Sequence, residues 1–158
     1  MPGHQPGLPG MEDVLTARSG YGTHPEVIAE VLAAVGDSAV VLSYEEDRAF
    51  AGVSLSRFGA VGSTRLDWNG VEVLERSAAF DGAELRRLVH DYGDERELAV
   101  VFWSNLAAPS VALDANAVAI HAETLLDCSP ESWIYLADSG VLIEFQDGDG
   151  FTVGRVPD

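Results

Sequence analysis

Basic residues are scarce in this sequence, and one kind is missing altogether. All nine are arginine and none is lysine, whereas aspartate and glutamate number 26, so the formal net charge is −17 at pH 7. A field of that sign repels nucleic acids and anionic membrane surfaces, and it attracts cationic proteins. The net charge of −17 is also larger in magnitude than a small domain needs in order to stay soluble. We therefore expect a basic protein as the partner, and neither nucleic acid nor membrane.

Cysteine is almost absent as well. The single residue, Cys128, excludes an internal disulfide framework and any site built from several thiolates. A chain of this kind is typical of the cytoplasm, which is the compartment we expect.

Long hydrophobic runs are missing too. The longest, Leu98 to Trp103, is far shorter than the ~20 residues that a membrane helix needs. The first ten residues, MPGHQPGLPG, have neither a basic region nor an apolar core, so they do not resemble a secretory signal. We expect residues 1–11 to form a disordered Pro/Gly leader, and residues 12–158 to form a single domain large enough to bury a core.

Helical periodicity marks three segments. Residues 25–35 carry an apolar stripe that ends at Gly36, and residues 82–92 carry a second stripe after Asp81, which with Glu84 and Phe80 predicts a helix start. Residues 114–127 fit a helix capped by Asp114 because of their alanine content, although a strand remains an alternative. A short helix over residues 11–18 is a weaker prediction.

Alternating and apolar segments predict the strands. We expect strands at 39–45 and 48–56 around an acidic turn, a central strand over 97–103, and a closing meander of three strands. Asn69-Gly70 predicts a two-residue hairpin that pairs Trp68 with Val71 and Leu66 with Val73. The fold class is therefore α+β: a single domain with a mainly antiparallel sheet of about seven or eight strands, packed with two or three helices.

The segment Asp147-Gly148-Asp149-Gly150 looks like the start of a calcium loop. An EF-hand loop needs an oxygen ligand at its fifth position and glycine at its sixth, and Phe151 and Thr152 stand there instead. We therefore predict a hairpin loop and no metal site. Asp147 and Asp149 should face solvent, while the inward side chains should be Val141, Ile143, Phe145, Phe151 and Val153.

Other catalytic patterns fail on their spacing. His121-Ala122-Glu123 matches part of a zinc deaminase motif, but the motif needs two cysteines and only Cys128 exists. On a helix, His121 would lie about 10 Å from Cys128, too far to act as its base. The sequence has no G-x-S-x-G elbow and no glycine-rich phosphate loop. We predict no catalytic residue and no cofactor.

Acidic loops and an aromatic side chain remain as candidates for partner binding. The predicted contact residues are Glu45, Glu46, Asp47, Trp68, Asp138, Glu144, Asp147 and Asp149. The leading hypothesis is a non-enzymatic acidic protein that neutralises a basic partner, with an immunity protein or antitoxin that inhibits a bacterial toxin as the natural setting. Two alternatives stay open: a small enzyme or ligand-binding domain with a site of scattered His, Asp, Glu and Arg, and an accessory domain of an oligomeric assembly. The sequence leaves open whether the acidic loops cluster on one face.

Overall fold

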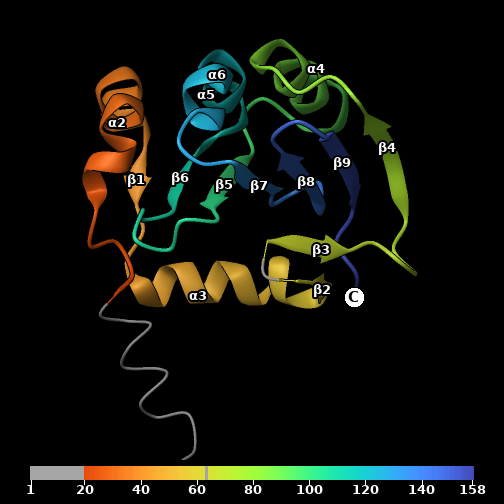
Figure 1. Cartoon of the computed structure of the whole chain (residues 1–158). Helices are drawn as coiled ribbons and strands as arrows, with labels where there is room; N and C mark the ends of the chain where they lie inside the picture. Colours follow the sequence, from red (N-terminus) through yellow and green to blue (C-terminus); the bar gives the residue numbers. More distant parts are fainter. Residues whose placement is uncertain (1–19, 63) are drawn as a thin grey trace, which may run out of the picture.

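The centre of the protein is a seven-stranded antiparallel sheet. In the computed structural model, which describes residues 20–62 and 64–158, the strands pair as antiparallel neighbours in one continuous sheet (Figure 1). Their order across the sheet is β1 (Val40–Val41), β6 (Val111–Asp114), β5 (Leu98–Trp103), β7 (Glu131–Leu136), β8 (Val141–Gln146), β9 (Gly150–Arg155) and β4 (Val73–Ser77). The leader and the short helix expected before residue 20 lie outside the described residues.

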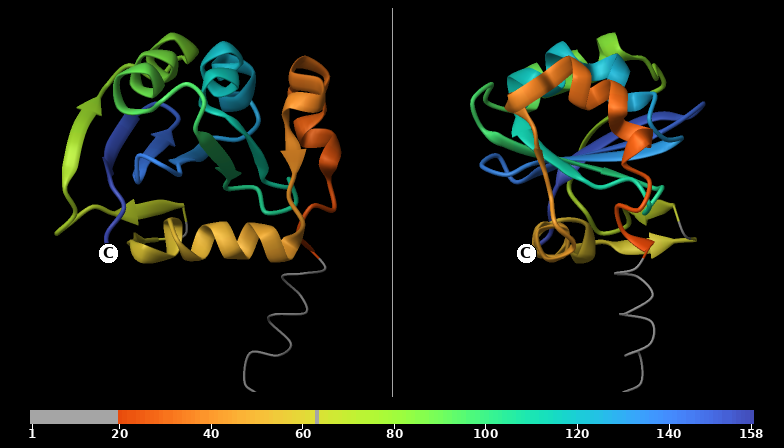
Figure 2. Two further views of the ribbon diagram at one scale, coloured as in Figure 1. Left: turned by 180° about the vertical axis from the view of Figure 1, so that it is seen from behind. Right: turned by 90° about the vertical axis from the view of Figure 1, so that its left-hand side faces the viewer.

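Helices and a small hairpin cover the two faces of this sheet, giving three layers (Figures 1 and 2). The upper face carries α2 (Ala29–Val35), which follows the 3-10 turn Pro25–Ile28 and precedes a second turn, Gly36–Ser38, together with α4 (Gly82–Tyr92), α5 (Ala115–Ile120) and α6 (Ala122–Leu126). The lower face carries α3 (Tyr44–Gly52), the 3-10 turn Leu55–Arg57, and a two-stranded sheet of β2 (Gly59–Val61) and β3 (Arg65–Asp67). The α+β prediction is confirmed.

Strand alternation divides the core into an upper and a lower cluster. On β5, Val101 and Trp103 pack upward with the helices, whereas Val100 and Phe102 pack downward toward α3. Successive side chains of a strand point to opposite faces, so a strand covered on both sides has to be apolar throughout. The prediction of a central, doubly covered strand at this position is confirmed.

Several local predictions are also confirmed. The helix expected over 25–35 is present and ends at Gly36, whose φ of 59° is costly for any other residue. Asp81 and Asp114 cap α4 and α5, as expected. The segment 115–126 is helical, with a break at His121 between α5 and α6. The inward set Val141, Ile143, Phe145, Phe151 and Val153 is buried, and Asp147 and Asp149 are exposed.

The prediction of two strands over 39–45 and 48–56 is wrong. Only Val40–Val41 form a strand, and α3 follows it. Ser43 and Glu46 form a capping box, in which the Ser43 Oγ accepts from the Glu46 N–H at 3.1 Å and the Glu46 Oε1 accepts from the Ser43 N–H at 2.9 Å. This reciprocal pair satisfies backbone donors at a helix start, so the acidic residues open a helix instead of turning between strands.

The prediction of a hairpin at Asn69-Gly70 is wrong as well. A turn is present, because the Val71 N–H donates to the Trp68 carbonyl, but β3 pairs with β2 and β4 pairs with β9. Gly70 has a φ of 78°, but Asn69 does not have a positive φ, because every described residue with a positive φ is a glycine. A type I′ hairpin turn needs positive φ at both central positions, and turns that lack it splay the strands apart. The chain therefore leaves the lower layer here and returns to the edge of the main sheet.

Candidate functional site: an acidic cleft on the upper layer

The predicted contact residues do not form one surface. Asp138 lies in the β7–β8 turn and Asp147 in the β8–β9 turn, at opposite ends of β8, about 17 Å apart for a strand of this length. Glu45 and Glu46 are exposed on the first turn of α3, which follows β1, and β1 lies four strands from β8, or about 19 Å. The acidic loops are therefore spread over the molecule.

Two of the predicted contact residues are buried. Asp47 is 7% exposed and Glu144 is 2% exposed. Glu144 accepts hydrogen bonds from the indole Nε1 atoms of Trp68, at 2.9 Å, and Trp133, at 3.0 Å, and from the backbone N–H of Leu66, at 2.7 Å. These hydrogen bonds hold the β2–β3 hairpin against the lower face of β8. The Glu144 carboxylate therefore stabilises the fold.

Trp68, Glu144 and Asp149 line one cavity of about 690 Å³ between the hairpin and strands β8, β9 and β4. Both signs of charge meet there, because Arg65 and Arg76 line the same space and the Arg65 Nη2 contacts the Asp149 Oδ2 at 2.7 Å. An arginine that already neutralises the carboxylate at the rim makes this cavity a poor receptor for a cationic partner.

A second cavity, of about 450 Å³, has walls of one sign. It lies on the upper layer between the start of α4, the end of α6 and the β8–β9 loop. Its exposed carboxylates are Asp81, Glu123, Asp127 and Asp147, and no arginine or histidine lines it. We call this cavity the acidic cleft.

Local structure explains how residues from three separate segments meet in the acidic cleft. Asp81 caps α4, where its Oδ1 accepts from the Glu84 N–H at 2.9 Å, and the Asp147 N–H donates to the Pro130 carbonyl at 2.9 Å. Gly82 lets α4 approach α6 closely, because a Cβ there would lie 2.8 Å from the backbone nitrogen of Glu123. The arrangement of the carboxylates around the acidic cleft therefore depends on Gly82 and on the hydrogen bond that holds the β8–β9 loop against Pro130.

The floor and edge of the acidic cleft are apolar. Leu126, Phe145 and Cys128 line its base, and Phe80 stands at its mouth with 50% of its surface exposed. Burial, together with the negative charges of Asp127 and Glu30, raises the pKa of the Cys128 thiol to about 11, and the thiol donates to the Thr124 carbonyl. A neutral, hydrogen-bonded thiol is a poor nucleophile.

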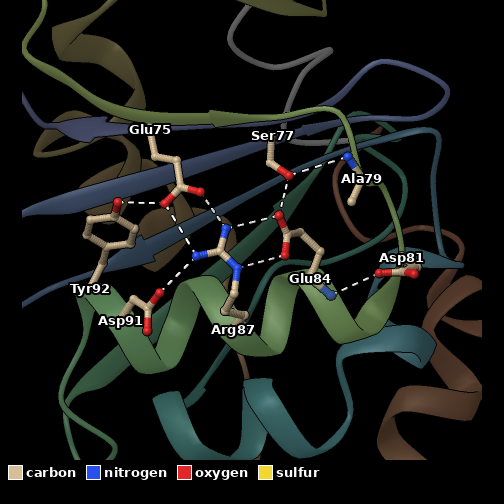
Figure 3. Close-up of polar contacts among 8 residues, drawn as sticks. All are labelled: Glu75, Ser77, Ala79, Asp81, Glu84, Arg87, Asp91 and Tyr92. Carbon is tan, nitrogen blue, oxygen red and sulfur yellow. Dashed lines mark hydrogen bonds and ion pairs between the residues drawn. The ribbon is translucent and has the colours of Figure 1, made fainter.

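Beside the cleft, one arginine is surrounded by three carboxylates (Figure 3). The Arg87 guanidinium contacts Glu84 at 2.8 Å, Asp91 at 2.8 Å and also Glu75, which accepts from the Tyr92 hydroxyl at 2.7 Å. Glu84 does not reach back to close a capping box at Asp81; its second oxygen accepts from the hydroxyl of Ser77. The network joins α4 to the edge strand β4.

The titration behaviour of this network is that of a structural ion cluster. Hydrogen bonds from Arg87 and then Ser77 lower the pKa of Glu84 to about 2, and hydrogen bonds from Arg87 and Tyr92 lower the pKa of Glu75. The Glu75 hydrogen bond raises the pKa of Tyr92. These shifts move the pKa values of Glu84, Glu75 and Tyr92 further from pH 7, whereas a general acid or base works best with a pKa near the operating pH.

Of the residues that line the acidic cleft, only Asp147 was among the predicted contact residues. Asp81 was expected as a helix cap and Phe80 as part of that helix start, while Glu123 was considered only as part of a zinc motif. Each residue has a local explanation, so no signal in the sequence links them.

Within residues 20–62 and 64–158, no three His, Cys, Asp or Glu side chains are placed to hold a metal ion, and no helix has the length and apolarity to cross a membrane. Neither a comparison with protein-family models nor one with curated proteins finds a match for this chain.

Proposed function

We propose that this chain is a non-enzymatic acidic protein that binds and neutralises a basic protein. The observation that supports this most directly is the acidic cleft, in which carboxylates from three segments of the chain face one cavity with no basic side chain among its lining residues. The net charge of −17 adds a long-range attraction for the same kind of partner. The setting we propose is the cytoplasm of a bacterium, where such a protein acts as an immunity protein or antitoxin against a toxin.

The cleft suits an arginine or lysine side chain of the partner. The cationic head would lie among Asp81, Asp127 and Asp147, and the aliphatic stem would cover the apolar floor at Leu126 and Phe145. Arginine and lysine bury their stems on apolar surface while the charge stays near water or a counter-charge. Phe80 offers a half-exposed aromatic edge, the type of residue that anchors protein interfaces.

The test pairs the chain with a basic protein encoded by a neighbouring gene. Co-expression should restore growth to cells that make this partner, and the two proteins should co-purify. Binding should weaken by about tenfold or more when the salt is raised from about 50 to 500 mM, because charge attraction between exposed groups is screened. An absence of binding at low salt would refute the proposal.

Charge variants locate the contact. The triple variant Asp81→Asn, Asp127→Asn and Asp147→Asn keeps the cap of α4, since asparagine caps as well as aspartate does, and removes three charges from the cleft. The matched control removes three exposed charges elsewhere, at Asp37, Asp94 and Glu95, with the corresponding amides. The cleft variant should bind about 10- to 100-fold more weakly, mostly through slower association, and the control by less than about threefold. Equal losses in both would show that only the overall field matters and that the cleft is not the contact.

A further inference from the structure

The cavity of about 690 Å³ beneath the sheet is lined by charged side chains of both signs, and they are not all matched within the protein. Its charged lining residues are Arg65, Asp67, Arg76, Glu144 and Asp149. The Arg65 Nη2 contacts the Asp149 Oδ2 at 2.7 Å, and Glu144 accepts hydrogen bonds from three N–H donors. The two residues that remain are one carboxylate, Asp67, and one guanidinium, Arg76.

Strand alternation directs Arg76 toward this cavity. Its neighbours on β4, Glu75 and Ser77, point upward and contact α4 (Figure 3). Successive side chains of a strand lie on opposite faces, so Arg76 points downward, and its partner on β9, Thr152, lines the same cavity. The Arg76 guanidinium makes no hydrogen bond or ion pair with a described residue, although carboxylates greatly outnumber arginines in this chain.

Asp67 brings the opposite charge from the β2–β3 hairpin. Its Oδ1 accepts a hydrogen bond from the Asn69 N–H at 3.0 Å, and it forms no ion pair with a described residue. Asp67 and Arg76 therefore line one cavity without pairing with each other. Whatever occupies the cavity meets a carboxylate and a guanidinium that no protein group neutralises.

A molecule with both charges matches the two side chains at once. A cation alone would pair with Asp67 and face the like charge of Arg76, and an anion alone would meet the reverse. An α-amino acid carries an ammonium and a carboxylate on the same carbon atom. A guanidinium donates two parallel N–H groups to a carboxylate, and an ammonium donates to a carboxylate in turn. The partly buried indole of Trp68 lines the same cavity and offers an apolar surface.

We propose that this cavity binds a free α-amino acid with an apolar or aromatic side chain. The carboxylate of the ligand lies on Arg76, its ammonium on Asp67 and its side chain against Trp68. The cavity has the volume of roughly 20 water molecules at about 30 Å³ each, which leaves room for a ligand of this size. This inference goes beyond the proposed function, because it concerns a small molecule bound beneath the sheet, whereas the acidic cleft lies on the upper layer.

The test is a titration of the full chain with L-phenylalanine and two analogues that each keep one charge. L-phenylalaninamide keeps the ammonium, and N-acetyl-L-phenylalanine keeps the carboxylate. Binding is followed through the indole N–H signal of Trp68 in ¹H–¹⁵N NMR spectra. L-phenylalanine should give a saturable shift with a millimolar or lower Kd, and each analogue should bind at least tenfold more weakly, because it loses a hydrogen bond between charged groups. No saturable shift with L-phenylalanine, or equal binding of either analogue, would overturn the proposal.

Two variants assign the charged contacts. Arg76→Gln should weaken binding of L-phenylalanine at least fivefold and should not weaken binding of L-phenylalaninamide, which has no carboxylate. Asp67→Asn keeps an acceptor for the Asn69 N–H; it should weaken binding of L-phenylalanine by a similar factor and should not weaken binding of N-acetyl-L-phenylalanine. Unchanged affinity for L-phenylalanine in either variant would contradict the proposed contacts.

The matched control is Arg96→Gln. Arg96 is a second exposed arginine whose guanidinium has no partner among the described residues, and it lies outside this cavity. Its affinity for L-phenylalanine should equal that of the wild type, and a loss as large as that of Arg76→Gln would show that only the overall charge matters. Since the titration needs no protein partner, its failure leaves the proposed function standing, and the cleft variants test that function separately.

Discussion

The Trp68 indole donates a hydrogen bond to the Glu144 carboxylate at 2.9 Å, across 76 positions of sequence. With the N–H of Leu66 and the indole of Trp133, it completes the donor set of a carboxylate that is 2% exposed. Because a buried charge is tolerated only when it is well hydrogen-bonded, this contact decides where the β2–β3 hairpin lies.

Glu144→Gln should destabilise the protein by about 2–4 kcal/mol, because it removes the charge and turns an amide donor toward N–H groups that need an acceptor. Urea unfolding followed by tryptophan fluorescence measures the loss. Glu131→Gln, at a less buried position on the neighbouring strand β7, should cost under about 0.5 kcal/mol. Similar losses in the two variants would contradict the role assigned to Glu144.

Stability should fall in acid because of Glu84 and Glu97. The hydrogen bonds from Arg87 and then Ser77 lower the pKa of Glu84 from 4.5 to about 2, and for Glu97, burial is outweighed by the hydrogen bonds from Ser139 and the backbone, so its pKa is also lowered. A lowered pKa in the folded state gives stability that is present above the ordinary pKa and is lost as the pH falls through the folded value. The free energy of unfolding should therefore decline between about pH 4.5 and pH 2.

Glu84→Gln tests the assignment of that decline. The variant should be less stable than the wild type at pH 7, and the difference should shrink toward pH 2. It should also shrink in high salt, because the Arg87 side chain is 41% exposed and its ion pairs are screened. A difference that stays constant over this pH range would exclude Glu84 as a source of the acid sensitivity.

Gly82→Ala should destabilise the protein by about 1–3 kcal/mol, because the added methyl group meets the backbone of Glu123 and the two helices must separate. It should also widen the acidic cleft and weaken binding of a basic partner. Gly52→Ala is the matched control, since a Cβ at Gly52 meets no atom within 4 Å. A loss of stability in both variants would point to helix ends in general and not to this contact.

Cys128 should react slowly with alkylating reagents in the folded protein. A pKa raised from 9.0 to about 11 lowers the thiolate fraction at neutral pH about 100-fold, and the half-buried position slows access further. Iodoacetamide labelling at pH 7.5, followed by mass spectrometry, should be at least 100-fold slower in the native chain than in concentrated urea. Comparable rates in the two states would contradict the burial of this thiol.

Local patterns predicted the elements that depend on near neighbours. Asp81, Asp114 and Gly36 mark helix ends through contacts within a few residues, and the stripe of 82–92 gave the bounds of α4 correctly. At Ser43 the prediction was wrong, because the alternation of the preceding residues favoured a strand while Ser43 and Glu46 form a capping box. Both signals were present in the sequence, and the cap prevailed because it satisfies backbone donors that a helix start leaves open.

The candidate sites were harder to predict than the elements. Glu144 was grouped with the exposed acidic residues of the neighbouring loops, yet the alternation of β8 turns its side chain downward onto the β2–β3 hairpin. Asp81 and Glu123 are 42 positions apart, and they meet only because Gly82 lets α4 approach α6. Contacts of this kind leave no local pattern.

The sequence alone determined the net charge, the helix caps and the alternation of the strands, because each is set by composition or by residues within one or two turns. Tertiary structure decided that β4 pairs with β9 and not with β3, that Glu144 is enclosed by donors, and that four carboxylates share one cleft. Strand pairing and the burial of charge depend on which distant segments supply the hydrogen-bond partners. That choice is made only when the whole chain is packed.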